Sequence, residues 1–213
     1  PQRAATADIP VHVALGRGDF FDVVSIASLE MESSEMYYRL LNCGFRLAAT
    51  GGTDNFSDVW LDPSGGTART YVHIDGAPPL TFGGWLDGVR NEQTFGTNGP
   101  LLFLNVDHTV LGSGTMIEPG GEIILESADD TIFNIRLTVT SIAPLERVEI
   151  IVNGAVAHTW EAADFVGDST ATAWQLSTHI ELLGSGWIAA RAIGPPSKYV
   201  GDAVPSAQTS PVY

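Results

Sequence analysis

Arg46-Leu-Ala-Ala-Thr-Gly-Gly-Thr-Asp54 is a short, mostly apolar segment that ends at two glycines and is followed by a carboxylate. This pattern predicts a buried β-strand that stops at the glycines and places Asp54 at its carboxyl end. In enzymes built on parallel barrels, the carboxyl ends of the strands carry the chemistry. Asp54 is therefore a candidate metal ligand, because carboxylate oxygens suit divalent metal ions. The alternative is an Asx-turn or a helix cap.

The residues before this segment predict a strand–helix–strand unit. Residues 20–27 form a compact apolar run that is typical of a buried strand. Ser33 or Ser34 is a candidate N-cap for an amphipathic helix, and Gly44 stands in the usual position just after a helix C-terminus. The next strand covers residues 45–50. Two strands joined by a helix are normally parallel, with a right-handed crossover.

The rest of the first hundred residues predicts one more strand and one more helix. Residues 68–74 alternate like a strand, and Thr81 is a candidate N-cap for a helix that includes Trp85. Residues 94–100 contain Asn-Gly and Gly-Pro pairs, which are typical of turns. Asn98 in this stretch is a candidate substrate-binding residue. The alternative is that the stretch is only a turn between two domains.

The pattern changes near residue 100. Short apolar stretches separated by turn residues predict strands at residues 101–106, 115–117, 122–126, 132–140, 146–152, 155–160, 171–180 and 186–192. Asn153-Gly154 is typical of a tight hairpin. Many short strands with regular turns indicate an antiparallel β-sandwich. The sequence therefore predicts an α/β domain over residues 1–100 and a β-sandwich domain over residues 101–213.

Composition excludes several classes of protein. The chain has 213 residues and a net charge of −15, with 10 basic and 25 acidic residues, so we expect no nucleic-acid partner. No run approaches the roughly 18 apolar residues of a membrane-spanning helix. The first residues lack the charged-then-apolar pattern of a signal peptide. They assign no compartment, and a cytoplasmic, periplasmic or secreted location stays open.

The residues that most often carry chemistry are scattered. The one cysteine, Cys43, has no histidine nearby in the sequence and is predicted to be a small buried apolar residue. The five histidines show no ligand spacing such as His-X-His. They are predicted to be ordinary strand or surface residues. Three tryptophans, Trp160, Trp174 and Trp187, are either core residues of the sandwich or a platform for a sugar.

Several blocks, taken together and in this order, resemble one family. They are Ala14-Leu-Gly-Arg17 with Asp19, Tyr38-Arg-Leu-Leu-Asn-Cys-Gly-Phe-Arg46, Gly51-Gly-Thr-Asp54, Thr97-Asn-Gly-Pro-Leu-Leu102, Gly186-Trp187 with Arg191-Ala192, and Thr209-Ser-Pro-Val-Tyr213. Nearly the whole chain is similar to the C-terminal half of metal-dependent hydrolases of the PHP superfamily, in the CehA/McbA branch. The most specific parts are residues 40–46, within the second block, and residues 97–102.

The resemblance implies the C-terminal part of a distorted (β/α)7 barrel over residues 1–100, followed by the antiparallel β-sandwich. In the family, divalent metals (Zn, Mn or Fe) at the strand ends activate water to hydrolyse phosphoesters or carbamate esters. Asp54 matches the position of a late aspartate ligand. The superfamily often has a histidine two residues later, where this chain has Phe56. The family His-X-His motif is expected to precede residue 1.

The resemblance and the composition together predict an activity and a set of partners. It is predicted to be the C-terminal portion of a metal-dependent hydrolase, to act on a small-molecule ester, and to be inactive and without a tightly bound metal as an isolated chain. The missing N-terminal barrel half or another subunit is the expected partner. The apolar surface of an incomplete α/β unit predicts self-association into a homo-oligomer. The alternative function is a non-catalytic β-sandwich module for protein interaction or carbohydrate binding.

Overall fold

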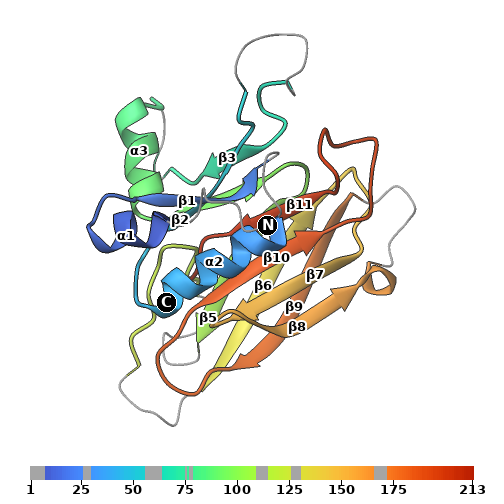
Figure 1. Cartoon of the computed structure of the whole chain (residues 1–213). Helices are drawn as coiled ribbons and strands as arrows, with labels where there is room; N and C mark the ends of the chain where they lie inside the picture. The colour runs from blue at the N-terminus through green and yellow to red at the C-terminus, as the bar shows by residue number, and fades with distance from the viewer. Residues whose placement is uncertain are drawn as a thin grey trace.

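The protein is described here by a computed structural model, which covers residues 8–25, 30–55, 64–74, 76, 79–108, 115–125, 131–165 and 172–213. Its described strands form three sheets, of two, six and three strands, and its described helices are few and short. None of the helices in these ranges is long and apolar enough to cross a membrane. The fold is therefore mostly β, in three layers (Figure 1).

The first layer is a strand–helix–strand unit. It consists of α1 (Ile9–Ala14), β1 (Phe20–Ser25), α2 (Glu30–Asn42) and β2 (Ala48–Gly52). Strands β1 and β2 pair in parallel, which confirms the predicted unit. Helix α2 begins at Glu30, so Ser33 and Ser34 lie inside the helix and the prediction that either caps it is wrong. Gly44 follows the helix with a φ of 85°, as its predicted position after the C-terminus requires.

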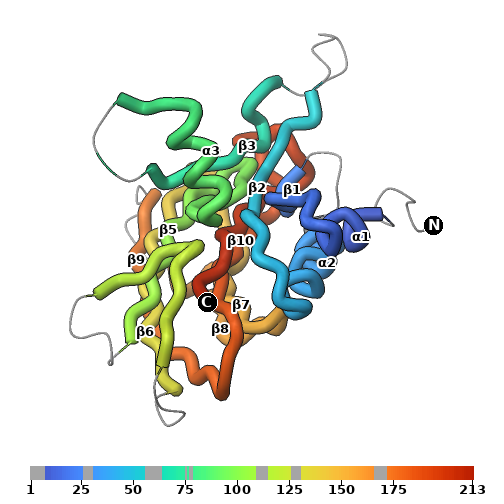
Figure 2. Tube along the Cα trace, turned by 90° about the vertical axis from the view of Figure 1, so that its left-hand side faces the viewer, coloured from blue at the N-terminus to red at the C-terminus, as the bar shows by residue number. Residues whose placement is uncertain are grey.

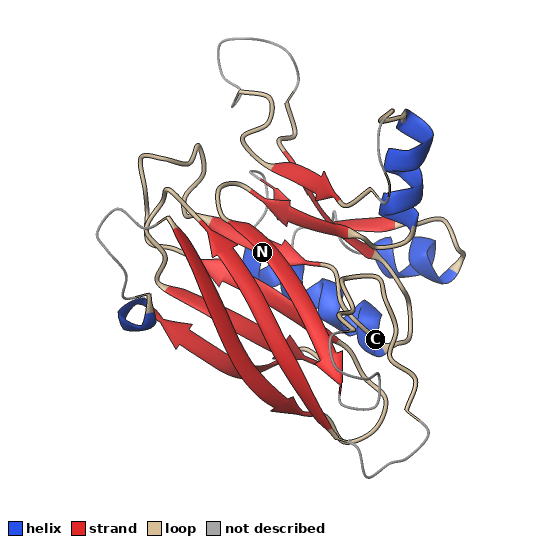
Figure 3. Ribbon diagram, turned by 180° about the vertical axis from the view of Figure 1, so that it is seen from behind, coloured by secondary structure: helices blue, strands red, loops and turns tan. Residues whose placement is uncertain are grey.

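Two antiparallel sheets form the other layers. The six-stranded sheet has the order β3 (Arg69–Val72), β4 (Thr94–Thr97), β11 (Ser206–Thr209), β10 (Ile188–Ile193), β7 (Arg147–Val152), β8 (Ala155–Glu161). The three-stranded sheet has the order β5 (Leu101–His108), β6 (Ile132–Thr140), β9 (Ala173–Glu181). Helix α3 (Phe82–Arg90) connects β3 to β4, and a short 3-10 helix covers Ala162–Asp164. Figure 3 shows the two sheets packed face to face.

One hydrophobic core fills the space between the two sheets. Strand β6 contributes Phe133, Ile135, Leu137 and Val139 from alternate positions, while the intervening side chains face outward. This alternation is what a strand with one buried face requires. The hairpin predicted at Asn153-Gly154 joins β7 to β8, with φ values of 50° and 87° at the two turn residues. The predicted β-sandwich is thus present.

A second core lies on the other side of the six-stranded sheet. Helix α2 and strands β1 and β2 pack there against Ile151, Trp187 and Ala189. Because both faces of β10 are covered, its Ile-Ala-Ala-Arg-Ala-Ile sequence is apolar at nearly every position. Helices α1 and α2 lie on one side of the molecule and the three-stranded sheet on the other (Figure 2). The six-stranded sheet is therefore the central layer.

The tryptophans serve as core residues rather than as an exposed platform. Trp160 and Trp187 are buried, one in each core. Trp174 packs against the core between the sheets, and its indole N–H donates to the carbonyl of Phe165. Of the two alternatives for these residues, the structure supports core packing.

The predicted C-terminal part of a (β/α)7 barrel is wrong. The next strand that the structure describes after β2 is β3, which pairs antiparallel with β4 at the edge of the six-stranded sheet and not in parallel with β2. Strand β2 instead crosses β4, and Gly51 and Gly96 meet where the two backbones touch. The central sheet takes strands from both sides of residue 100, where the sequence predicts the boundary between residues 1–100 and 101–213.

Hydroxyl side chains join β2 to the central layer in place of a strand ladder. Ser210 Oγ accepts from the Ala49 N–H at 2.8 Å, and Thr94 Oγ1 donates to the Ala49 carbonyl at 2.7 Å. Thr70 Oγ1 accepts from the Gly51 N–H at 3.0 Å and donates to its carbonyl at 2.9 Å. Buried backbone groups need partners, and these hydroxyls supply them without another β-strand.

Several local predictions can be compared directly with the structure. Thr81 caps α3 as predicted, because its Oγ1 accepts from the Gly84 N–H at 3.0 Å. Cys43 is exposed, so the prediction that it is buried is wrong. Residues 94–100 contain β4 as well as the predicted turn. Residues 115–117 and 122–125 form no strand, although Ile117 makes a single bridge to β5.

Candidate functional site

Asp54 lies just beyond the carboxyl end of β2. Its side chain is exposed and its backbone adopts a left-handed conformation, with a φ of 55°. Such a conformation is uncommon outside glycine and asparagine or aspartate. Gly51 and Gly52 are the last residues of the strand, and the buried Thr53 separates them from Asp54. The structure therefore places this carboxylate at a strand end, where the sequence predicts it, and shows that it is open to solvent.

A second carboxylate, Asp22, accompanies the end of β2. It lies on β1 directly opposite Thr50, whose Oγ1 donates to Asp22 Oδ1 at 2.5 Å. The carboxylate extends toward Gly52, where an added Cβ atom would be 3.4 Å from Oδ2. Asp22 is exposed, whereas its neighbours Phe21 and Val23 are buried toward α2. Asp22 is thus an exposed carboxylate beside β2, although Phe20 and Val24 on the same strand are apolar.

These residues do not complete a metal site by themselves. The described part of the chain contains no group of three or more His, Cys, Asp or Glu residues that could hold a metal ion. None of the described histidines joins the strand ends in such a group, and Phe56 lies outside the described residues. Zn, Mn and Fe sites need three or more protein ligands. A metal at Asp54 therefore requires ligands from elsewhere.

Asn98 is buried and has a structural role. Its side-chain Nδ2 donates to Asp202 Oδ2 at 3.1 Å and to the Val204 carbonyl at 2.8 Å. Its Oδ1 accepts from the Ser206 N–H at 2.7 Å. These bonds hold the turn after β4 against the segment that leads into β11. Of the two alternatives, this geometry favours the turn, and a substrate contact stays a prediction.

A charged cluster joins the loop before β2 to the last residue of the sequence. Arg46 Nε donates to Glu92 Oε1 at 3.0 Å, and Tyr213 Oη donates to Glu92 Oε2 at 2.5 Å. The Arg46 guanidinium lies 4.1 Å from the centre of the Tyr213 ring and also donates to the Gly120 carbonyl at 2.7 Å. Glu92 is only 4% exposed. The cluster thus connects the loop before β2 to the segment before β4 and to the last residue of the chain.

Burial dominates the electrostatics of this cluster. Desolvation raises the pKa of the Glu92 carboxyl, although the Tyr213 hydroxyl and Arg46 oppose the shift. Desolvation also raises the pKa of Tyr213, and the negative charge of Glu92 adds to that effect. An acid whose pKa is higher in the folded state is stabilising below its unfolded pKa. That stabilisation is lost as the pH rises through the folded pKa.

Glu92→Gln is therefore expected to change how stability depends on pH. In the wild-type protein, the free energy of unfolding falls as the pH rises above the ordinary carboxyl pKa of 4.5, because the carboxyl then ionises in the unfolded chain while burial keeps it protonated in the folded protein, up to its raised folded pKa. The variant lacks this fall. The melting temperature of the variant minus that of the wild type is therefore expected to increase between pH 4 and pH 8. Glu122→Gln, at an exposed position beside Arg46, is the control. A melting-temperature difference that is constant over this range contradicts the assignment.

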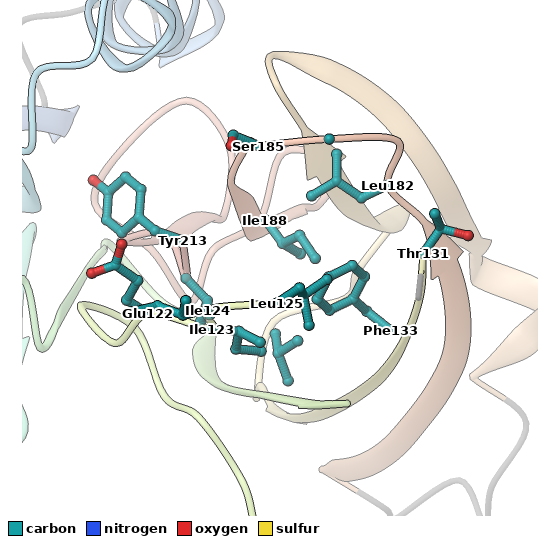
Figure 4. Close-up of a pocket in the computed structure, with 14 residues that line it drawn as sticks. Glu122, Ile123, Ile124, Leu125, Thr131, Phe133, Leu182, Ser185, Ile188 and Tyr213 are labelled. Atoms are coloured by element: carbon teal, nitrogen blue, oxygen red, sulfur yellow. The ribbon is translucent and has the colours of Figure 1, made fainter. Parts of the chain in front are cut away.

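Two hollows flank Tyr213. The first, of about 530 Å3, opens at the end of the sandwich. Figure 4 shows its apolar side chains, among them Leu125, Phe133 and Ile188, gathered together, with Glu122 and Tyr213 at one side. The second, of about 550 Å3, shares Glu122, Ser185, Gly186 and Tyr213 with the first and reaches Arg46 and Trp187. The first is lined mainly by apolar side chains, whereas the second is also lined by the polar side chains of Asn42, Glu122 and Asn153.

Three residues of these sites were not singled out from the sequence. Asp22 is a single carboxylate within an otherwise apolar strand, and such an inconsistency in the pattern can indicate a functional residue. Glu92 and Tyr213 are 121 residues apart, and no local pattern pairs them. Their contact depends on the tertiary fold alone.

Comparison with known proteins adds no assignment. No family model, no curated protein and no solved structure matches this chain. The PHP-type hydrolase thus stays a resemblance of sequence blocks. A functional conclusion has to rest on the residues and on where the fold places them.

Proposed function

We propose that this chain is the C-terminal portion of a metal-dependent hydrolase that acts on phosphoester or related ester bonds, and that Asp54 supplies one metal ligand. The observation that carries the proposal is the position of Asp54. It is exposed at the carboxyl end of a parallel strand, in a left-handed backbone conformation, two residues beyond Gly52, which the Asp22 carboxylate approaches. The sequence blocks that resemble the PHP superfamily support the same assignment.

A divalent ion of the Zn, Mn or Fe type would supply an activated water and a Lewis acid for ester hydrolysis. The chain's own contribution is more limited. Asp54 binds from the end of β2, and Thr50 orients Asp22 through the bond to Oδ1. Since no complete ligand set exists among the described residues, the remaining ligands come from another segment or subunit. The isolated chain is accordingly expected to be inactive.

The sandwich has a defined part in this proposal, which is to fix the position of β2. Asn42 at the end of α2 accepts from the Trp187 indole N–H at 2.8 Å and donates to the Asn153 carbonyl at 3.0 Å. Ser210 and Thr94 hold β2 itself. Most of these residues fall in the blocks that resemble the hydrolase family. Functional groups need rigid support to within a fraction of an ångström, and this interface provides it.

The test is ester hydrolysis by the product of the complete gene, supplied with Zn2+, Mn2+ or Fe2+. Bis-p-nitrophenyl phosphate and p-nitrophenyl acetate are suitable substrates. Asp54→Asn is expected to lower the rate by about 100-fold or more, because even residues that only support metal ligands cost about 10- to 100-fold. Asp87→Asn, an exposed change on α3, serves as the control. Full activity in Asp54→Asn, or equal activity in the isolated chain, contradicts the proposal.

A further inference from the structure

The central sheet extends beyond the sheet that covers it. Strand β5 packs against β10 and β11, and β9 packs against β8. Strands β3 and β4 lie at the far edge of the six-stranded sheet, beyond this cover. A cavity of about 360 Å3 lies in that uncovered part, between β3, β4 and the edge strand β5. Its volume is within the range of about 300–1,000 Å3 in which proteins hold small molecules.

Three aromatic rings form one wall of this cavity. Tyr71 on β3 stacks on Phe95 on β4, with ring centres 5.0 Å apart and planes 8° apart. Phe103 on β5 meets Phe95 edge to face at 5.7 Å. Tyr71 is 41% exposed and Phe103 is 50% exposed. Aromatic surface of this extent in contact with water gains from being covered by a flat apolar partner.

Groups of both charges, together with a neutral amide, lie around the rings. His73 and Glu118 form a hydrogen-bonded pair at the edge of the cavity, and Asn105 lines it from β5. The guanidinium of Arg69 lies 5.6 Å from the centre of the Tyr71 ring. A cation and an anion therefore lie near the same cavity, so neither a purely anionic nor a purely cationic ligand is favoured. A purely apolar ligand would cover these polar groups without bonding to them.

We infer that this cavity between β3, β4 and β5 binds a neutral sugar ring, either free or as one unit of a glycan. A pyranose has a flat face of C–H groups that packs on an aromatic ring, and hydroxyls at its edge that both donate and accept hydrogen bonds. Phe103, which is half exposed, provides the surface for stacking, and Tyr71 borders it. His73, Glu118 and Asn105 provide the partners for the hydroxyls. The site is separate from Asp54 and does not depend on the proposed hydrolase activity.

Affinity electrophoresis of the full chain tests the inference. The native gels contain soluble xylan, mixed-linkage β-glucan, galactomannan or hydroxyethyl cellulose. At least one of these polysaccharides is expected to retard the wild-type protein. Phe103→Ala is expected to weaken the retardation by about tenfold, which corresponds to the loss of one aromatic contact. Asn105→Ala, which leaves all three rings in place, is expected to weaken it as well.

Two controls make the outcome specific. Phe82→Ala removes an aromatic side chain on α3 that is 74% exposed and does not line the cavity, and it is expected to leave the retardation unchanged. Asp54→Asn is also expected to leave it unchanged, so a failure here is distinct from a failure of the hydrolase proposal. Unretarded migration of the wild type in every gel overturns the inference. Undiminished retardation of both Phe103→Ala and Asn105→Ala, with melting temperatures near wild type, also overturns it.

Discussion

Replacing Arg191 by leucine is expected to lower the free energy of unfolding by about 3–5 kcal/mol. Arg191 on β10 lies directly opposite Glu149 on β7 and binds it through Nε at 2.8 Å and Nη2 at 2.6 Å. Both side chains are only 7% exposed. The substitution leaves the Glu149 carboxylate buried, with Arg147 at 2.9 Å as its remaining charged partner. An incompletely paired buried charge is among the largest single destabilising effects.

Urea denaturation of three variants separates this effect from the loss of packing. The double variant Glu149→Met/Arg191→Leu removes both charges and is expected to be more stable than Arg191→Leu alone. Arg39→Leu breaks an exposed pair with Glu35 on α2 and is expected to cost less than about 1 kcal/mol. If Arg191→Leu were no more destabilising than Arg39→Leu, the pair would not be buried in the folded protein.

Gly96→Ala is expected to cost about 1–3 kcal/mol. At this position an added Cβ atom would lie 2.4 Å from the Thr50 carbonyl oxygen and 2.9 Å from the Gly51 nitrogen. Both are backbone atoms, so the contact cannot be relieved by rotating a side chain. Strand β2 would have to move away from β4, and the hydroxyl bonds between the two layers would lengthen.

Gly83→Ala on α3 is the matched control, because the nearest atom to its added Cβ is 4.0 Å away. Alanine is the better helix former, so this change is expected to be neutral or slightly stabilising. Thermal unfolding followed by circular dichroism measures both variants. Equal melting temperatures for Gly96→Ala and the wild type would contradict the close crossing of β2 over β4.

Local structure could be predicted from the sequence because its determinants are local. The helix cap at Thr81, the hairpin at Asn153 and the alternation along β6 each depend on residues that are neighbours in the chain. The parallel pair β1–β2 followed from the order strand, helix, strand. Each of these features holds whatever the rest of the fold is.

The arrangement of the layers could not be predicted in the same way. Residues 195–213 are rich in Pro and Ser and the strands predicted from the sequence end at residue 192, yet β11 lies inside the central sheet and Val212 is buried. Strand β4 was hidden in a stretch with strong turn signals. In both places small polar side chains such as Thr94 and Ser210 are buried because they bond to the backbone of β2. Such contacts between residues far apart in the chain cannot be predicted from local sequence patterns. The barrel prediction is wrong for that reason.

The candidate sites show the same difference between features set by neighbouring residues and features set by the tertiary fold. The position of Asp54 at a strand end followed from Gly51-Gly52 and the apolar residues before them. Asp22 required the register of β1 against β2, which places it opposite Thr50. The aromatic wall required three strands from two sheets, since Tyr71 and Phe103 are brought together only by the edge of the sandwich. Residues that converge from distant strands carry no local signal.

The most direct test of the central claim is the metal content of the complete gene product, measured by inductively coupled plasma mass spectrometry after purification without chelators. The wild-type protein is expected to carry at least one Zn, Mn or Fe ion per chain. Asp54→Asn is expected to lose it, and Asp87→Asn to retain it. A wild-type protein without bound metal, or an Asp54→Asn variant with the wild-type metal content, would contradict the account.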